Sequence, residues 1–166
     1  MTDTPASSTF DLVQQLADRL LAKKLIISTA ESCTGGGIAH ALTELAGSSA
    51  WFDSGFVTYS NEAKQRLLNV PAILFDSEGP GAVSEATVLA MTMGAIANSR
   101  ANLSVAVSGI AGPDGGTQEK PVGTVWIAWQ WEDKCLARCF QFSGDRAAVR
   151  EATVRAALEG CLLLID

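Results

Sequence analysis

The chain has 166 residues, of which 48% are hydrophobic and 18% charged, and its formal net charge is −6, which is typical of one globular domain with a buried core. Its 12 Lys and Arg residues form no cluster, which argues against a nucleic-acid or anionic-membrane surface but allows a pocket for one phosphate. No apolar run reaches the roughly 18 residues of a membrane helix, and the first residues lack the pattern of a secretory signal. We therefore expect a cytoplasmic protein.

The first half of the chain predicts three helices separated by two strands. Apolar residues at helical spacing and residues that favour N-caps mark the helices, whereas short β-branched or apolar runs mark the strands. The helices are expected at residues 9–23, 34–45 and 61–69, and the strands at 25–30 and 55–60.

The second half predicts a helix, a strand, a long loop, a hairpin and a final helix. The hairpin turns at Glu132–Lys134, between two runs rich in aromatic and aliphatic residues. The helices are expected at 84–99 and 146–165, and the strands at 101–109, 124–131 and 134–143.

This order of elements predicts an α/β fold. Alternating strands and helices favour parallel strands, and the hairpin adds antiparallel ones, so we expect a mixed β-sheet with helices on both faces, in three layers. The chain shows no repeat or linker. We expect a single domain over residues 8–166, preceded by a frayed polar tail at 1–7.

Metal and disulfide chemistry have few ligands in this sequence. Cys135 and Cys139 fall in one predicted strand, where residues four apart lie roughly 13 Å from each other. His40 is the single histidine, which leaves a zinc site short of ligands. We expect free thiols, no metal and no cofactor.

The segment Glu31–Gly37 (ESCTGGG) joins a predicted strand to a predicted helix. A helix N-terminus presents unpaired N–H groups that can bind an anion or a developing oxyanion, and glycines let a ligand approach them. Ser32 is then a candidate nucleophile, and Cys33 is its rival, because a helix N-terminus lowers the pKa of a thiol. The alternative is that Ser32 or Thr34 only caps the helix.

A serine nucleophile needs a base, and His40 lies about 9 Å further along the predicted helix, too far to serve Ser32. Lys64 is a candidate because it lies in the first turn of a helix, where the helix dipole, burial or a nearby arginine would lower its pKa. Tyr59, the single tyrosine, could bind a hydroxyl or stack on a flat substrate. The alternatives are a solvated lysine and a structural aromatic residue.

Two further segments suggest a ligand. In Ser108–Gly116, four glycines flank Pro113–Asp114 at a strand end, where α/β proteins bind ligands, although Pro-Asp-Gly is also ordinary turn chemistry. Asp145 is a plausible N-cap of the last helix, so Arg146 occupies its first turn, where an anionic ligand would offset the unfavourable charge. The alternative for Arg146 is an exposed surface residue.

Three motifs together resemble the CinA family C-terminal domain: E-S-C-T-G-G at residues 31–36, Y-S-N-x-x-K at 59–64 and G-I-A-G-P-D-G-G at 109–116. The similarity covers about residues 8–165. It implies hydrolysis of nicotinamide mononucleotide to nicotinate mononucleotide and ammonia by a metal-free serine amidohydrolase, which acts as a homodimer. The alternative is a non-catalytic nucleotide-binding or regulatory module of the same family.

The resemblance also implies roles for individual residues. Ser32 would be the nucleophile and Lys64 its base, Tyr59 would assist positioning or proton transfer, and Arg146 would tune Lys64 or bind the substrate. Longer family members carry a further domain, whose activity we do not transfer to this chain. The expected substrate-binding residues are Thr34, Gly35, Gly36, Ser108, Gly109, Gly112 and Gly115.

Overall fold

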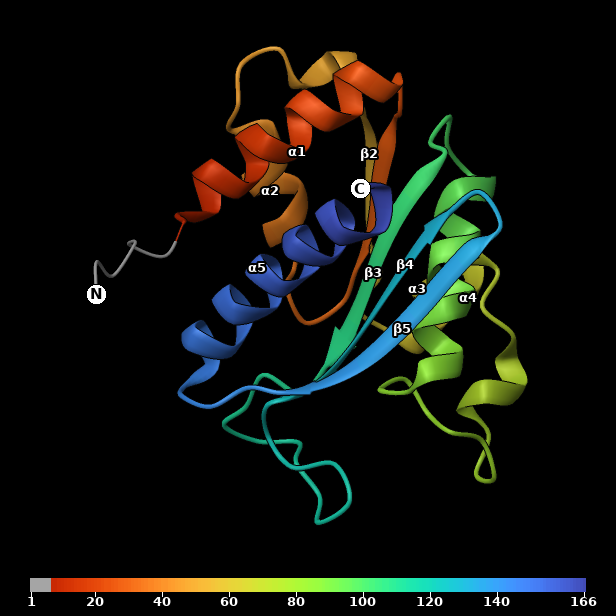
Figure 1. Cartoon of the computed structure of the whole chain (residues 1–166). Coiled ribbons are helices and arrows are strands. Elements are labelled where there is room, and N and C mark those ends of the chain that lie inside the picture. The colour runs from red at the N-terminus through yellow and green to blue at the C-terminus, as the bar shows by residue number, and fades with distance from the viewer. Residues whose placement is uncertain (1–6) are drawn as a thin grey trace.

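The computed structural model describes residues 7–166 and contains a five-stranded sheet. The strands are β1 (Ile27–Glu31), β2 (Phe52–Val57), β3 (Leu103–Gly109), β4 (Thr124–Trp131) and β5 (Lys134–Gln141). Their order in the sheet is β2-β1-β3-β4-β5 (Figure 1). The first three are parallel, whereas β4 and β5 are antiparallel to their neighbours, so the sheet is mixed as predicted. Except for Ser7, the predicted tail lies outside the described residues.

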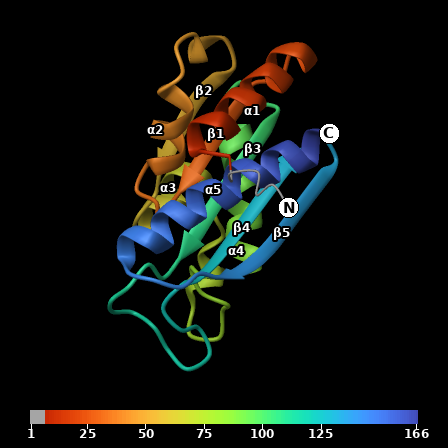
Figure 2. The same cartoon turned by 60° about the vertical axis from the view of Figure 1, so that its left-hand side comes forward.

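Helices cover both faces of the sheet, which confirms the predicted α/β fold in three layers (Figures 1 and 2). On one face lie α1 (Thr9–Lys23), α2 (Gly37–Thr43) and α5 (Arg146–Ile165). On the other lie α3 (Asn61–Leu68) and α4 (Glu85–Ala97). The short 3₁₀ helices are η1 (Ser48–Ala50) and η2 (Ala72–Phe75). Within residues 7–166, no helix is both long and apolar enough to cross a bilayer.

Side chains of different size point to the two faces of the central strands. Val105 and Ile127 pack in the core under α1 and α5, because alternate residues of a strand face opposite sides. Ala30, Ala106 and Ala128 lie in register on the other face and pack in the core under α4. The small alanines therefore leave room for α4 against the sheet.

Two predicted elements are displaced by three residues: one begins later than predicted and the other lies earlier in the chain. The helix predicted at 34–45 begins only at Gly37, because Gly35 and Gly36 have φ values of +59° and +97° and form a turn. The strand predicted at 55–60 is Phe52–Val57, and the chain leaves the sheet before Tyr59. The other predicted elements agree with the structure to within two residues at either end.

The carboxyl ends of β1, β2 and β3 lie side by side at one edge of the sheet. In open α/β sheets this edge is the usual place for a ligand. The connections that leave it carry the ESCTGGG segment, Tyr59 and the glycine-rich loop, and α5 begins beside them (Figure 1). The fold thus brings together segments that are far apart in the sequence.

Candidate active site

Ser32 and Lys64 form a hydrogen-bonded pair below the surface. Ser32 follows β1 and Lys64 lies on α3, which follows the neighbouring parallel strand β2. Lys64 Nζ lies 3.0 Å from Ser32 Oγ and 2.7 Å from the carbonyl oxygen of Thr58. The lysine is 1% exposed and the serine 9% exposed, so the pair is largely shielded from water while the serine keeps some access.

Lys64 is buried without a carboxylate partner, and no ion pair found within residues 7–166 includes it. Burial lowers its pKa from 10.5 to about 8, because the ammonium form loses its hydration. The predicted arginine contribution is absent, since a Cys33 thiolate is the other influence and it acts in the opposite direction. A substantial fraction of Lys64 is therefore a neutral amine, able to accept a proton, near pH 8.

Cys33 differs from its serine neighbour in reactivity. It is 4% exposed and packs in the core under α1 and α5. Burial, with a smaller contribution from the Glu31 carboxylate, raises the pKa of Cys33 to about 11. The predicted lowering of this pKa is therefore wrong, and the thiol is almost entirely protonated at neutral pH, which makes it a poor nucleophile.

Glu31 is a fully buried carboxylate that organises the turn after β1, and the sequence analysis gave it no role. One carboxylate oxygen accepts hydrogen bonds from Thr34 Oγ1 at 2.6 Å and Ile38 N at 2.9 Å. The other accepts from Thr29 Oγ1 at 3.1 Å and Ala39 N at 2.9 Å. Its charge at the strand end was visible in the sequence, but its partners were not.

The Glu31 carboxylate accepts hydrogen bonds from the amides of Ile38 and Ala39 at the N-terminus of α2. These two amides are therefore not available to bind an anionic ligand, contrary to the prediction for this helix. Other amides remain. The N–H groups of Cys33, Thr34 and Gly36 have no acceptor within residues 7–166. The turn after Ser32, rather than the helix proper, therefore offers donors to an oxyanion.

Arg146 connects three segments beside this pair. Its Nη2 lies 2.9 Å from the hydroxyl of Tyr59, and its Nη1 donates to the carbonyl oxygen of Gly112 at 2.8 Å. Asp145 is the N-cap of α5, as predicted, and accepts from Ala148 N. The Tyr59 side chain is 60% exposed, so its ring remains open to a ligand.

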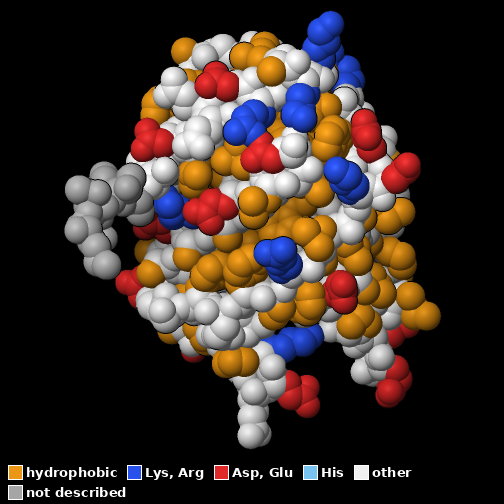
Figure 3. Space-filling model, viewed as in Figure 1, with side chains coloured by type: hydrophobic (Ala, Val, Ile, Leu, Met, Phe, Trp, Pro, Cys, Tyr) orange, Lys and Arg blue, Asp and Glu red, His pale blue; other side chains and the backbone are white. Residues whose placement is uncertain are grey.

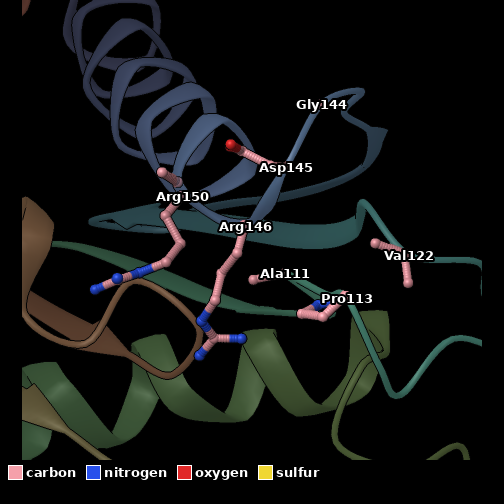
Figure 4. A pocket seen from close by; sticks show the side chains of 8 residues that line it. Ala111, Pro113, Val122, Gly144, Asp145, Arg146 and Arg150 are labelled. Carbon is pink, nitrogen blue, oxygen red and sulfur yellow. The ribbon is translucent and has the colours of Figure 1, made fainter.

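A cavity of about 520 Å³ adjoins Arg146 at the start of α5. Arg150, one turn further along the helix, also lines it and donates from Nη2 to the carbonyl oxygen of Thr34 at 3.2 Å (Figure 4). Arg150 was not among the residues predicted from the sequence, although its spacing of four residues from Arg146 places both on one helix face. Gly35 lies against this contact: a Cβ there would be 3.3 Å from Arg150 Nη2.

The glycine-rich loop contributes less to the cavity than its composition suggested. A Cβ added at Gly109 would lie 2.6 Å from a methyl of Val125, and one added at Gly112 would lie 2.5 Å from a methyl of Val122. Close packing therefore explains both glycines. Ser108 is 1% exposed. None of the seven predicted substrate-binding residues lines the cavity: Thr34, Gly35, Gly36, Ser108, Gly109, Gly112 and Gly115.

Other ionisable groups provide no metal site in the described residues. Among residues 7–166, no group of three or more His, Cys, Asp or Glu side chains is placed to hold a metal ion. His40 lies on the surface of α2, where its Nε2 is 3.4 Å from the Glu44 carboxylate, and its side chain is 76% exposed.

Comparison with known proteins gives consistent similarities. Residues 9–165 match the family described as the CinA C-terminal domain. The chain is 54% identical to nicotinamide-nucleotide amidohydrolase PncC of Pseudomonas putida (92% of this chain, 94% of that protein). It is 48% identical to PncC of Escherichia coli K12 (96% and 94%). The crystal structure of competence/damage inducible protein CihA from Agrobacterium tumefaciens has a TM-score of 0.92 at 45% identity and covers both chains fully.

Replacing Glu31 by glutamine tests its role in the turn. The Glu31→Gln amide keeps one acceptor oxygen and turns an NH2 group toward donors, so buried N–H or O–H groups lose their partner. We expect the free energy of unfolding to fall by about 1–3 kcal/mol in urea denaturation.

The control is Glu44→Gln at the exposed C-cap of α2, where a change within about 0.5 kcal/mol is expected. A Glu31→Gln protein as stable as the wild type would show that the four contacts do not hold the turn.

Proposed function

Because the chain belongs to the CinA C-terminal domain family, we propose that it hydrolyses nicotinamide mononucleotide to nicotinate mononucleotide and ammonia, a step of pyridine-nucleotide salvage. Two relatives that share about half of their residues with this chain are named nicotinamide-nucleotide amidohydrolases. The observation that carries the proposed mechanism is the 3.0 Å contact between Lys64 Nζ and Ser32 Oγ, formed by a lysine whose pKa is lowered to about 8. A module that only binds nucleotides would not need a lysine of lowered pKa beside a hydroxyl.

In the first half of the reaction, neutral Lys64 takes the hydroxyl proton of Ser32 as Oγ attacks the carboxamide carbon. The carbonyl oxygen becomes an oxyanion, and the unpaired N–H groups of the turn at 33–36 are the available donors. The protonated lysine then returns its proton to the departing nitrogen. The C–N bond breaks, ammonia leaves, and an ester on Ser32 remains.

In the second half, Lys64 takes a proton from a water molecule, and the oxygen of this water attacks the ester carbon. The collapse of this second tetrahedral intermediate breaks the bond to Ser32 Oγ, and Lys64 returns the proton to it. The product is nicotinate mononucleotide, whose new carboxylic acid loses its proton to solvent, where the released ammonia takes it up as ammonium. The same amine thus carries the serine proton to the leaving nitrogen in the first half and a water proton back to the serine in the second.

Tyr59 and Arg146 are proposed to place the substrate. The guanidinium of Arg146 fixes the Tyr59 hydroxyl, and the exposed ring is free to stack on the flat pyridine of the substrate. The same guanidinium fixes the glycine-rich loop through the carbonyl of Gly112. Arg146 therefore acts on substrate position rather than on the pKa of Lys64.

Neighbouring substitutions separate the serine from the thiol. Ser32→Ala removes the attacking oxygen, so we expect ammonia release from nicotinamide mononucleotide to fall by at least about 1,000-fold while the far-UV circular dichroism is unchanged. Cys33→Ala keeps the backbone N–H, and we expect activity within about tenfold of wild type, together with resistance of the wild type to iodoacetamide.

Full activity of Ser32→Ala, or an inactive but folded Cys33→Ala, would exclude the serine mechanism. If wild-type protein bound nicotinamide mononucleotide and released no ammonia, the chain would be the non-catalytic nucleotide-binding module.

The pH dependence of kcat/KM should follow the deprotonation of Lys64. Only the neutral amine accepts the serine proton, so kcat/KM should rise as pH increases through about 8 and then level off. At pH 7 it should be roughly tenfold below the plateau. A Lys64→Arg variant, whose guanidinium stays protonated, should be inactive throughout. A flat profile from pH 6.5 to 9.5 would remove Lys64 as the base.

We also propose a cytoplasmic homodimer. The edge strand β5 has one unpaired side, a feature that proteins usually cover or blunt. Leu136 on β5 and Leu163 on α5 are 43% and 71% exposed, and both line a groove of about 340 Å³. Figure 3 shows hydrophobic side chains gathered over this part of the surface. A second copy that covers the groove would bury both leucines.

Light scattering on the purified protein checks the dimer. We expect twice the monomer mass for wild type and the monomer mass for Leu163→Glu, because a buried charge is costly. Met93→Glu is the control, since Met93 on α4 is 60% exposed and lies on the other face of the sheet. A dimer that survives Leu163→Glu and dissociates with Met93→Glu would place the interface on α4 instead.

A further inference from the structure

We propose that Arg150, together with Arg146, binds the phosphate of the nucleotide substrate in the cavity at the start of α5, and so makes the protein prefer the nucleotide to its unphosphorylated nucleoside. The proposal rests on the amidohydrolase function above. It adds Arg150, a specificity residue that neither the motifs nor the resemblance supplied.

The cavity has the size and chemistry for a charged group of a small ligand. Its volume of about 520 Å³ falls within the usual range of ligand pockets. Apart from the two arginines and Asp145, its lining residues are small or apolar: Ala111, Pro113, Val122, Gly144 and Ala147. The arginines are therefore its only source of positive charge among the described residues.

Neither arginine has a countercharge. No ion pair among residues 7–166 includes Arg146 or Arg150, although the protein carries a net charge of −6. Asp145 also lines the cavity, but its carboxylate caps α5 and points away from both guanidinium groups (Figure 4). An exposed Arg146 and a partly buried Arg150 thus share a cavity in an acidic protein, an arrangement that a bound anion would stabilise.

Arg150 has unused hydrogen-bonding capacity. A guanidinium carries five N–H donors, yet the protein provides Arg150 with one acceptor, the Thr34 carbonyl, at 3.2 Å. Its Nε is buried and has no partner within the described residues. An unsatisfied buried donor is unfavourable, and a phosphate offers several oxygens to the planar fork of an arginine.

The cavity also lies in the right place relative to the reacting groups. Arg150 contacts the carbonyl of Thr34, two residues after Ser32, and Arg146 contacts the hydroxyl of Tyr59, so the cavity lies beside the segments that carry both side chains proposed to act on the nicotinamide group. Both arginines extend from the same side of α5 (Figure 4). A phosphate held there anchors the far end of a substrate whose amide lies at Ser32.

The test compares nicotinamide mononucleotide with nicotinamide riboside, which lacks the phosphate, in wild type and Arg150→Gln. We expect kcat/KM for the nucleotide to fall roughly 10- to 100-fold, mainly through a higher KM, because charged hydrogen bonds to the phosphate are lost. The value for the riboside should change less than about threefold. Arg150→Lys should recover part of the loss because it restores the charge.

The matched control is Arg155→Gln, on the same helix but paired with Glu159 and outside the cavity, which should leave both substrates unaffected. Equal losses for nucleotide and riboside in Arg150→Gln, or an unchanged KM for the nucleotide, would overturn the proposal and leave Arg150 as a tether for the Thr34 turn.

A binding measurement separates this proposal from the catalytic one. Titration calorimetry with inorganic phosphate and with nicotinate mononucleotide needs no turnover, and affinity for both should weaken at least tenfold in Arg150→Gln. If wild type released no ammonia but bound phosphate in this Arg150-dependent way, the amidohydrolase function would fail and the phosphate site would stand. Binding unaffected by Arg150→Gln would remove the site whatever the activity.

Discussion

The burial of Lys64 without a countercharge is the constraint on which the proposed chemistry depends. Removing an ammonium from water is unfavourable, and the protein answers with a lowered pKa rather than with a carboxylate. The two oxygens near Nζ are those of Ser32 and of the Thr58 carbonyl. They come from the connections that follow β1 and β2, so the parallel pairing of these strands is what brings the proposed base and nucleophile together.

Glu31 shows why the absence of a carboxylate at Lys64 is a property of the fold. A fully buried glutamate lies one residue before Ser32, and pairing with Lys64 would keep the lysine protonated and unable to act as the proposed base. The four donors around Glu31 are instead the neutral side chains and amides of its own connection. The two buried ionisable groups are thereby used separately, one to shape the turn and one to accept a proton.

The sequence could predict the order of the elements and the mixed sheet, because period and propensity are local properties. It could not predict where α2 begins, since that depends on the turn at Gly35 and Gly36 and on the distant Glu31 side chain that accepts from the amides of Ile38 and Ala39. Cys33 was misjudged for a similar reason: its local position suggested a lowered pKa, and burial beneath distant helices raised it. Arg150 was missed because an arginine in the second turn of a helix looks like an ordinary surface residue until the fold brings the Thr34 carbonyl to it.

Helix α5 links the core to the proposed phosphate site. Buried residues occur along its whole length, and near its far end Gly160 lies so close to the Trp129 ring that a Cβ would be 2.2 Å from it. The Trp129 indole N–H also donates to the carbonyl of Ala157. A helix fixed in this way presents the arginines of its first two turns at a defined distance from the Ser32 turn. Binding energy from a phosphate remote from the reacting carbon can then be used to hold the amide at the proposed nucleophile. Two arginines without a countercharge at the start of α5 therefore suit the proposed hydrolase, which would hold its substrate by the phosphate and cleave it at the amide.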